Sequence, residues 1–206
     1  MPRLALSGTD EGRLRALATD VGLGADRWMP VVADLRDRGA ARDAIAATEA
    51  ALGRIDIVLH IVGGYTGGTP IAELDPADVA GMLDQHLWTT LHVTQAVVPG
   101  MVERGWGRVM AVSAAAASEP TAKTAPYAIG KAAGEALLRS LARETANTGV
   151  TVNLVIVKAI DKGGERTTDP KKSSWTTPEE IADVFRYLAS NGAAAITGAR
   201  IPLFGR

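Results

Sequence analysis

Short apolar stretches typical of β-strands alternate with longer amphipathic stretches along this whole chain. Ile55–Val62 is apolar except at Asp56 and His60, and Val150–Val157 is nearly as apolar. Runs of this kind are typical of strands buried on both faces of a parallel sheet. Alternation with helices predicts a parallel sheet covered on both faces through right-handed crossovers. We therefore expect an α/β fold with a doubly wound, Rossmann-like parallel sheet in three layers, forming a single domain over residues 1–206.

The expected elements follow from hydrophobic periodicity and from turn and capping residues. Pro30 removes a hydrogen-bond donor, so its strand should lie at a sheet edge, whereas Ile55–Val62 should be central. The strands are predicted at residues 3–6, 28–32, 55–62, 108–113, 150–157 and 196–203, and the helices at 13–21, 38–52, 76–104, 127–146 and 178–190.

Composition excludes several classes of protein. The net charge is −1 with both signs interleaved, which argues against nucleic-acid and membrane partners. No apolar stretch reaches the roughly 18 residues that a membrane-spanning helix needs, so we expect a cytoplasmic protein. Cysteine is absent, and the three histidines lack the spacing of metal ligands, so no metal site is expected.

Tyr127 and Lys131 are the first candidates for chemistry. They lie four residues apart and therefore share one face of a predicted helix. An ammonium beside a phenol favours the phenolate, and a fall of roughly 3 units in the tyrosine pKa would give an acid/base group that works near pH 7. The alternative is an amphipathic helix on which both are ordinary boundary residues.

The order of three motifs resembles the short-chain dehydrogenase/reductase family from Leu4 to Gly205. These motifs are glycines 63 and 64 after a strand, Ser113 at a strand end, and the Tyr127-x-x-x-Lys131 helix. The resemblance implies NAD(P)(H)-dependent interconversion of an alcohol and a carbonyl, with Tyr127 as acid/base, Lys131 as its electrostatic partner and Ser113 orienting the substrate oxygen. It also implies cofactor contacts from Tyr127 and Lys131 and from Asp34, Leu35, Gly63 and Gly64.

The N-terminus departs from the family pattern of a strand, a glycine-rich turn and a helix. Leu4–Val21 resembles the family's second strand and helix, so that one N-terminal β-α unit would be missing or replaced. Alternatively, Gly8–Gly12 is a degenerate form of the glycine turn, with Asp10 and Glu11 repelling a pyrophosphate. Family order 3-2-1-4-5-6-7 makes the first strand central. If this first strand is absent, either the strand at residues 3–6 moves into its place or a neighbouring subunit supplies a strand. A shortened N-terminus is the simplest explanation for the absence.

The site itself departs from the family pattern at two places. His86 aligns with an asparagine that holds a proton-relay water; histidine can do the same, or can be a satisfied core residue. The family serine position is Ala114, and a one-residue step turns Ser113 to the other face of the strand, with Ser118 as a weaker substitute.

Two main functions remain open from the sequence, beside a third possibility, a non-redox lyase or dehalogenase on the same scaffold. The first is the oxidoreductase, with a slight lean to NADP(H) because no acidic residue ends the first strand. The second is a degenerate family member that binds a ligand or partner without redox catalysis. Apolar stripes on helices 76–104 and 127–146 resemble the family's subunit interface, so we expect a homodimer or homotetramer.

Overall fold

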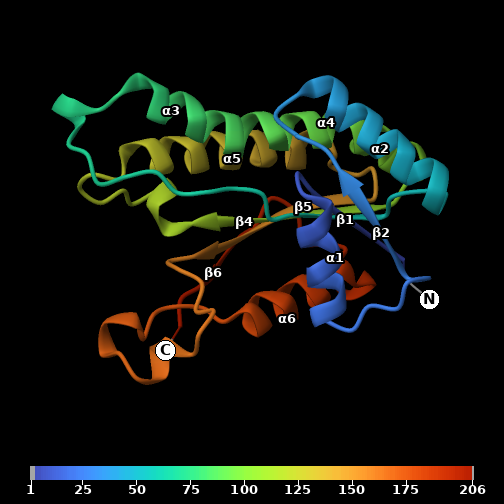
Figure 1. The fold of residues 1–206 in the computed structure, drawn as a ribbon. Coiled ribbons are helices and arrows are strands. Elements are labelled where there is room, and N and C mark those ends of the chain that lie inside the picture. The colour runs from blue at the N-terminus through green and yellow to red at the C-terminus, as the bar shows by residue number, and fades with distance from the viewer. Residues whose placement is uncertain (1–2, 206) are drawn as a thin grey trace.

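The strands of the middle layer lie in two separate parallel sheets. The computed structural model describes residues 3–205 (Figure 1), and within them the first two strands pair only with each other. The other four form a second sheet in the order β3-β4-β5-β6. The strands are β1 (Leu4–Gly8), β2 (Trp28–Val32), β3 (Ile57–His60), β4 (Gly107–Ala114), β5 (Val150–Val157) and β6 (Arg200–Leu203).

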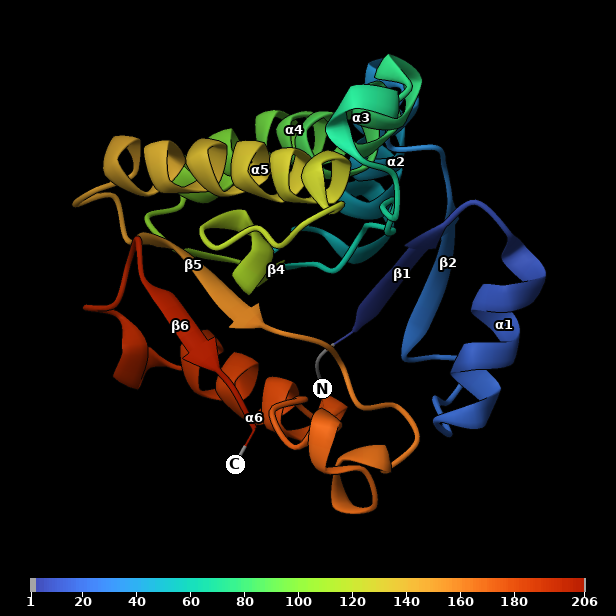
Figure 2. The same cartoon turned by 90° about the vertical axis from the view of Figure 1, so that its left-hand side faces the viewer.

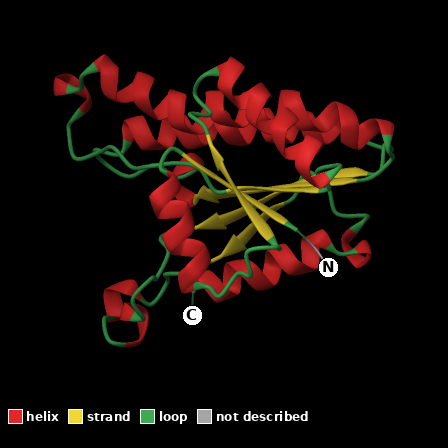
Figure 3. Cartoon of the chain, turned by 45° about the vertical axis from the view of Figure 1, so that its right-hand side comes forward, coloured by secondary structure: helices red, strands yellow, loops and turns green. Residues whose placement is uncertain are grey.

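Helices cover both sides of the strand layer. Figures 1 and 2 show α2, α3, α4 and α5 on one side and α1 and α6 on the other, and the strands run between these layers in Figure 3. The helices are α1 (Glu11–Asp20), α2 (Arg38–Leu52), α3 (Pro76–Leu83), α4 (Thr89–Glu103), α5 (Ala125–Glu144) and α6 (Pro178–Ala189). Within residues 3–205, no helix combines the length and the apolar character that a membrane span requires.

Alternate residues of β4 feed two different cores. Val109 belongs to the core under α4 and α5, whereas Met110 belongs to the core under α6 with Phe185 and Leu188. All eight residues of β5 are buried. These strands are buried on both faces, as their apolar sequences predict.

The prediction of a central third strand is wrong for residues 3–205. β3 covers only Ile57–His60, pairs only with β4, and leaves the side chains of Ile57 and Leu59 41% and 45% exposed. The N-terminal strand has not moved beside it, because Leu4–Gly8 pairs with Trp28–Val32. The expected edge position of Pro30 is confirmed, since β2 has β1 as its one described neighbour.

The long helix expected at residues 76–104 contains a wide turn. The segment Asp84–Trp88 between α3 and α4 is π-helical, and turns of this kind are frequent at functional sites. Gly130 and Gly134 let α5 approach this segment: a Cβ atom at these positions would lie 2.7 Å from the Met82 carbonyl oxygen and 2.8 Å from that of His86. The close approach holds His86 against α5 beside Tyr127.

Candidate active site

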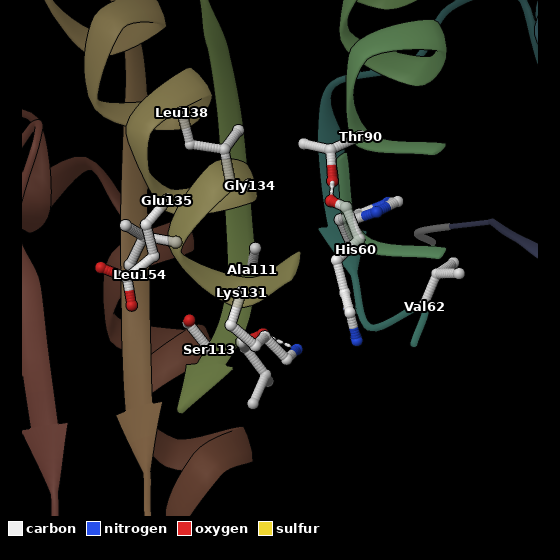
Figure 4. A pocket seen from close by; sticks show the side chains of 12 residues that line it. His60, Val62, Thr90, Ala111, Ser113, Lys131, Gly134, Glu135, Leu138 and Leu154 are labelled. Carbon is white, nitrogen blue, oxygen red and sulfur yellow. Dashed lines mark hydrogen bonds between the residues drawn. The ribbon is translucent and has the colours of Figure 1, made fainter. Parts of the chain in front are cut away.

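The candidate residues gather where β3 and β4 end beside the first turns of α5. Lys131, Ser113, His60 and His86 line a cavity of about 20 Å³ there (Figure 4). A cavity needs roughly 10–15 Å³ to hold one water molecule, so this one has room for a water between the ammonium and the imidazoles. The topology has thus brought together four residues that are up to 71 positions apart (131 − 60).

Lys131 turns toward the sheet rather than toward the tyrosine hydroxyl. Its Nζ atom donates a hydrogen bond to the Val112 carbonyl oxygen at 3.1 Å and lies 5.9 Å from the centre of the Tyr127 ring. Burial lowers the pKa of Lys131 from 10.5 to about 8, and Glu135 opposes this shift. The lysine is therefore mostly charged at pH 7 but easily deprotonated.

The expected lowering of the Tyr127 pKa does not occur in this arrangement. Burial raises the pKa of Tyr127 above 10, and Tyr65 raises it further. The Tyr65 ring centre lies 5.1 Å away and that of His86 5.7 Å away, the latter edge-on. The physical reason is that aromatic rings surround the phenol while the ammonium bonds a carbonyl. Tyr127 is accordingly a protonated phenol at neutral pH.

His86 and His60 are neutral buried histidines. Burial, with the Lys131 charge as a smaller cause, lowers the pKa of each from 6.5 to about 4. The His86 Nε2 atom lies 3.1 Å from the Gly64 carbonyl oxygen, which can only accept, so this nitrogen carries the hydrogen. His60 Nε2 lies 3.3 Å from the hydroxyl oxygen of Thr89. His86 is thus a satisfied buried residue that still lines the cavity, so neither expected role is excluded.

Ser113 lies on the cavity side of β4, whereas the next residue does not. The side chain is 3% exposed, and its Oγ atom has no hydrogen-bond partner among residues 3–205. Ser113 lines the cavity with Lys131, but Ala114 does not. Ser118 does not line this cavity, and its hydroxyl receives a hydrogen bond from Arg200 at 3.2 Å. The unpaired hydroxyl of Ser113 is therefore the one that faces the candidate site.

Gly63 and Gly64 make room for protein side chains. A Cβ atom at Gly63 would lie 2.3 Å from the His86 ring, and one at Gly64 would lie 2.4 Å from Oε1 of Gln85. Gly63 also has φ of +154°, which side chains disfavour. Packing of the π-helical turn against the His86 ring thus requires Gly63, whereas at Gly64 the flexible Gln85 side chain could move.

The residues expected at the adenine end are engaged with the protein. Asp34 holds the Arg36 guanidinium through both carboxylate oxygens, and this contact lowers the pKa of Asp34 to about 2. The Leu35 carbonyl oxygen lies 3.0 Å from Nδ1 of His92. Asp34 remains at the surface, so its carboxylate could still accept a further hydrogen bond.

The described residues do not fit a whole dinucleotide. Helix α1 begins at the turn after β1, where Asp10 accepts the Arg13 backbone N–H at 2.9 Å and Glu11 pairs with Arg15. Two carboxylates at this helix end repel a pyrophosphate, which helix N-termini otherwise attract. Residues 3–205 thus provide a side-chain cluster at the carboxyl edge of the sheet but no phosphate cradle at α1.

One member of the cluster was not expected from the sequence. The Tyr65 ring packs against that of Tyr127 at an interplanar angle of 58°, although Tyr65 is 64% exposed. The available signal was an aromatic residue directly after Gly63 and Gly64, at the carboxyl end of a strand. Such positions on parallel sheets line ligand sites.

Comparison with known proteins gives the family. A family profile described as enoyl-(acyl carrier protein) reductase matches residues 3–203. The chain belongs to the short-chain dehydrogenase/reductase family. A relative described as the (2S)-[(R)-hydroxy(phenyl)methyl]succinyl-CoA dehydrogenase subunit BbsC of Thauera aromatica is 34% identical, over 95% of this chain and 80% of its own length. Acetoacetyl-CoA reductase of Cupriavidus necator is 28% identical, over 84% and 74%.

Solved structures support the fold. Sorbitol-6-phosphate 2-dehydrogenase SrlD from Erwinia amylovora matches with a TM-score of 0.88 at 20% identity, covering 99% of this chain and 89% of that one. The chain is therefore an oxidoreductase of the short-chain dehydrogenase/reductase family with a Rossmann-like fold and parallel sheets.

In this family member, Lys131→Met is expected to stabilise the fold. The folded pKa of about 8 lies below the unfolded value of 10.5, so the native state loses its proton first and wild-type stability rises between pH 8 and 10.5. At pH 7 the buried charge costs about 3 kcal/mol, which methionine removes. Urea unfolding at pH 7 and pH 10 measures the effect. Lys162→Met, at an exposed loop position, is the control. A destabilised Lys131→Met protein would contradict the prediction.

Proposed function

We propose that the chain interconverts a carbonyl and an alcohol with NAD(P)(H), and that Tyr127 moves the proton. The observation that carries the proposal is the Tyr127 and Lys131 pair at the carboxyl edge of the sheet, beside the unpaired hydroxyl of Ser113. A phenol whose pKa is raised is a proton donor at neutral pH, which favours reduction of the carbonyl.

The other residues have supporting roles in this proposal. Lys131 supplies positive charge, which favours the negative charge that forms on the phenol when its proton leaves. Ser113 donates its free hydroxyl hydrogen to the substrate oxygen, and neutral His86 holds the cavity water through which a proton returns. Asp34, Leu35, Gly63 and Gly64 are the proposed cofactor contacts.

A second candidate is a family member that binds a ligand or partner without redox catalysis. It is favoured by Ala114 at the family serine position, by the Lys131 bond to Val112 and by the carboxylates at the start of α1. The Thauera relative is described as one subunit of a dehydrogenase. A role as one subunit of a larger enzyme is consistent with this candidate.

Cofactor preference, assembly and location complete the proposal. We propose a slight preference for NADP(H) over NAD(H), a small carbonyl or alcohol as the substrate, and a cytoplasmic location. Trp88, Val102 and Ile129 on the α4 and α5 side are 38–44% exposed, so these helices are the proposed surface for a homodimer or homotetramer.

Titration with NADPH and NADH tests the oxidoreductase. Because α1 offers no phosphate cradle, we expect saturable but weak binding, with a Kd of about 0.1–1 mM. Cofactor fluorescence or the heat of binding measures it. Loss of the Lys131 charge should weaken binding about tenfold, whereas Lys162→Met should not. If neither nucleotide binds saturably up to about 5 mM, the redox proposal for this chain is wrong and the second candidate is retained.

A further inference from the structure

A buried ion pair lies one helical turn beyond Lys131. Tyr127, Lys131 and Glu135 follow one another at every fourth position of α5 and therefore share one face of this helix. Glu135 is 7% exposed, and its Oε2 atom accepts a hydrogen bond from Nε of Arg200 at 2.6 Å. Charged side chains are rarely buried unless they are paired. The last residue of this series is therefore held in place by its ion pair.

The strand register places Arg200 under this face of α5. Ile201 and Leu203 pack into the core under α6, so Arg200, which alternates with them on β6, points to the opposite side of the sheet. Arg200 pairs with Leu154 on β5, which belongs to the core under α4 and α5. Its guanidinium also donates to the Ser118 hydroxyl at 3.2 Å. Helix α5 and the loop that follows β4 thus both fix this cation.

Glu135 is the one carboxylate of residues 3–205 that lines the cavity with Lys131 (Figure 4). The other titratable groups around the ammonium carry no negative charge at neutral pH. His60 and His86 are neutral there, because burial is the main cause that holds the pKa of each at about 4. Tyr127 stays a protonated phenol, since burial raises its pKa. Compensation for the ammonium charge within the cavity therefore falls to Glu135.

The buried ammonium needs such compensation. Its one hydrogen bond among the described residues goes to the Val112 carbonyl oxygen, which is a neutral group. Burial lowers the pKa of Lys131 to about 8, and the charge of Glu135 opposes this shift. Without the carboxylate the ammonium would have no opposite charge in the cavity, so more of the lysine would lose its proton at neutral pH.

We propose that Glu135 is a positioning residue: its carboxylate, fixed by Arg200, keeps Lys131 charged in the cavity. Arg200 holds the carboxylate on the sheet side of α5 and offsets part of its charge, so that the attraction on the ammonium is moderate. The consequence for catalysis rests on the proposed function, in which the lysine charge favours the negative charge that forms on Tyr127. The electrostatic role itself does not rest on it.

Nitrogen NMR of the chain labelled with isotopic lysine tests this role without any need for turnover. The Nζ signal that disappears in Lys131→Met is the one to follow, and its titration between pH 6 and pH 10 gives the midpoint at which Lys131 loses its proton. Glu135→Gln keeps the shape of the side chain and an oxygen that can accept from Arg200, but removes the negative charge. We expect this substitution to lower the midpoint by about one pH unit.

Two further variants separate this role from support of the fold. Glu144 lies at an exposed position of the same helix, where its carboxylate accepts a hydrogen bond from the Ser140 hydroxyl, and Glu144→Gln should leave the midpoint unchanged. Glu135→Leu combined with Arg200→Met replaces the ion pair by apolar groups, a change that is often neutral for stability. We expect thermal unfolding of this double variant to be close to that of the wild type while the midpoint stays low.

Three results would overturn the inference. They are an unchanged midpoint in Glu135→Gln, an equal shift in Glu144→Gln, and a midpoint that recovers together with the stability in the double variant. If the redox proposal holds, the alkaline limit of the reduction rate should move to lower pH with the midpoint, and a limit that stays in place would overturn the link to catalysis. A chain that never turns over would remove the redox proposal, whereas a lowered midpoint would still support the role of Glu135.

Discussion

Acidification from pH 7 to pH 4 is expected to remove a third or more of the stability of this protein. Folding lowers the pKa of His60 and of His86 from 6.5 to about 4. The unfolded state therefore binds more protons than the native state between these values, and stability falls as pH falls through this window. A shift of this size corresponds to about 2–3 kcal/mol per histidine, or about 5 kcal/mol for both. Whole domains are stable by only about 5–15 kcal/mol.

Urea unfolding at pH 7, 5.5 and 4.5 measures this loss. His86→Asn should roughly halve the pH dependence, because it removes one of the two buried imidazoles. His92→Gln is the matched control, since His92 contacts the Leu35 carbonyl oxygen and is separate from the cavity. Asp34 affects the pH dependence of stability only at lower pH, because folding shifts the pKa of its carboxyl from 3.8 to about 2. Stability that is flat from pH 7 to pH 4.5 would show that the two histidines are hydrated in solution.

The sequence determined the fold most accurately where local pattern and tertiary burial agree. The strands Trp28–Val32 and Val150–Val157 and the helix Arg38–Leu52 match the prediction residue for residue. At Ile55–Val62 the two disagree. The apolar residues on both faces of this segment indicate that it is suited to a buried position in a sheet. Its pairing within residues 3–205 depends instead on which strands lie beside it. No local pattern encodes that dependence.

The candidate site could be located but not described from sequence. Spacing and strand ends place Tyr127, Lys131, Ser113 and His86 near one another, and their common location follows from parallel topology. The direction of the Tyr127 pKa depends on where the Lys131 ammonium points. That orientation is set by the Val112 carbonyl oxygen at 3.1 Å, a contact between residues 19 positions apart. The π-helical turn that positions His86 likewise has no sequence signal as clear as a cap or a proline.

Tyr127→Phe is expected to lower kcat/KM for carbonyl reduction about a thousandfold. The substitution removes the only proton that the phenol can donate and keeps the ring between Tyr65 and His86. General acid catalysis contributes roughly 10²–10⁴-fold, so a loss of this size corresponds to about 4 kcal/mol of transition-state stabilisation. Acetoacetyl-CoA, for which the Cupriavidus relative is named, is a suitable first substrate, with NADPH oxidation as the measured signal.

Tyr65→Phe is the matched control for this substitution. It removes a hydroxyl from the neighbouring ring while keeping the tilted ring contact with Tyr127, so activity should stay within about threefold and thermal unfolding should be unchanged for both variants. Burial raises the pKa of Tyr127, so the phenol stays protonated at neutral pH, and the wild-type reduction rate should fall above about pH 8, where Lys131 loses its charge. NADPH affinity gives the second readout: an acid that acts only in the chemical step leaves it unchanged. A Tyr127→Phe protein that keeps more than about a tenth of the activity would place the proton donor elsewhere, and His86 would be the next residue to test.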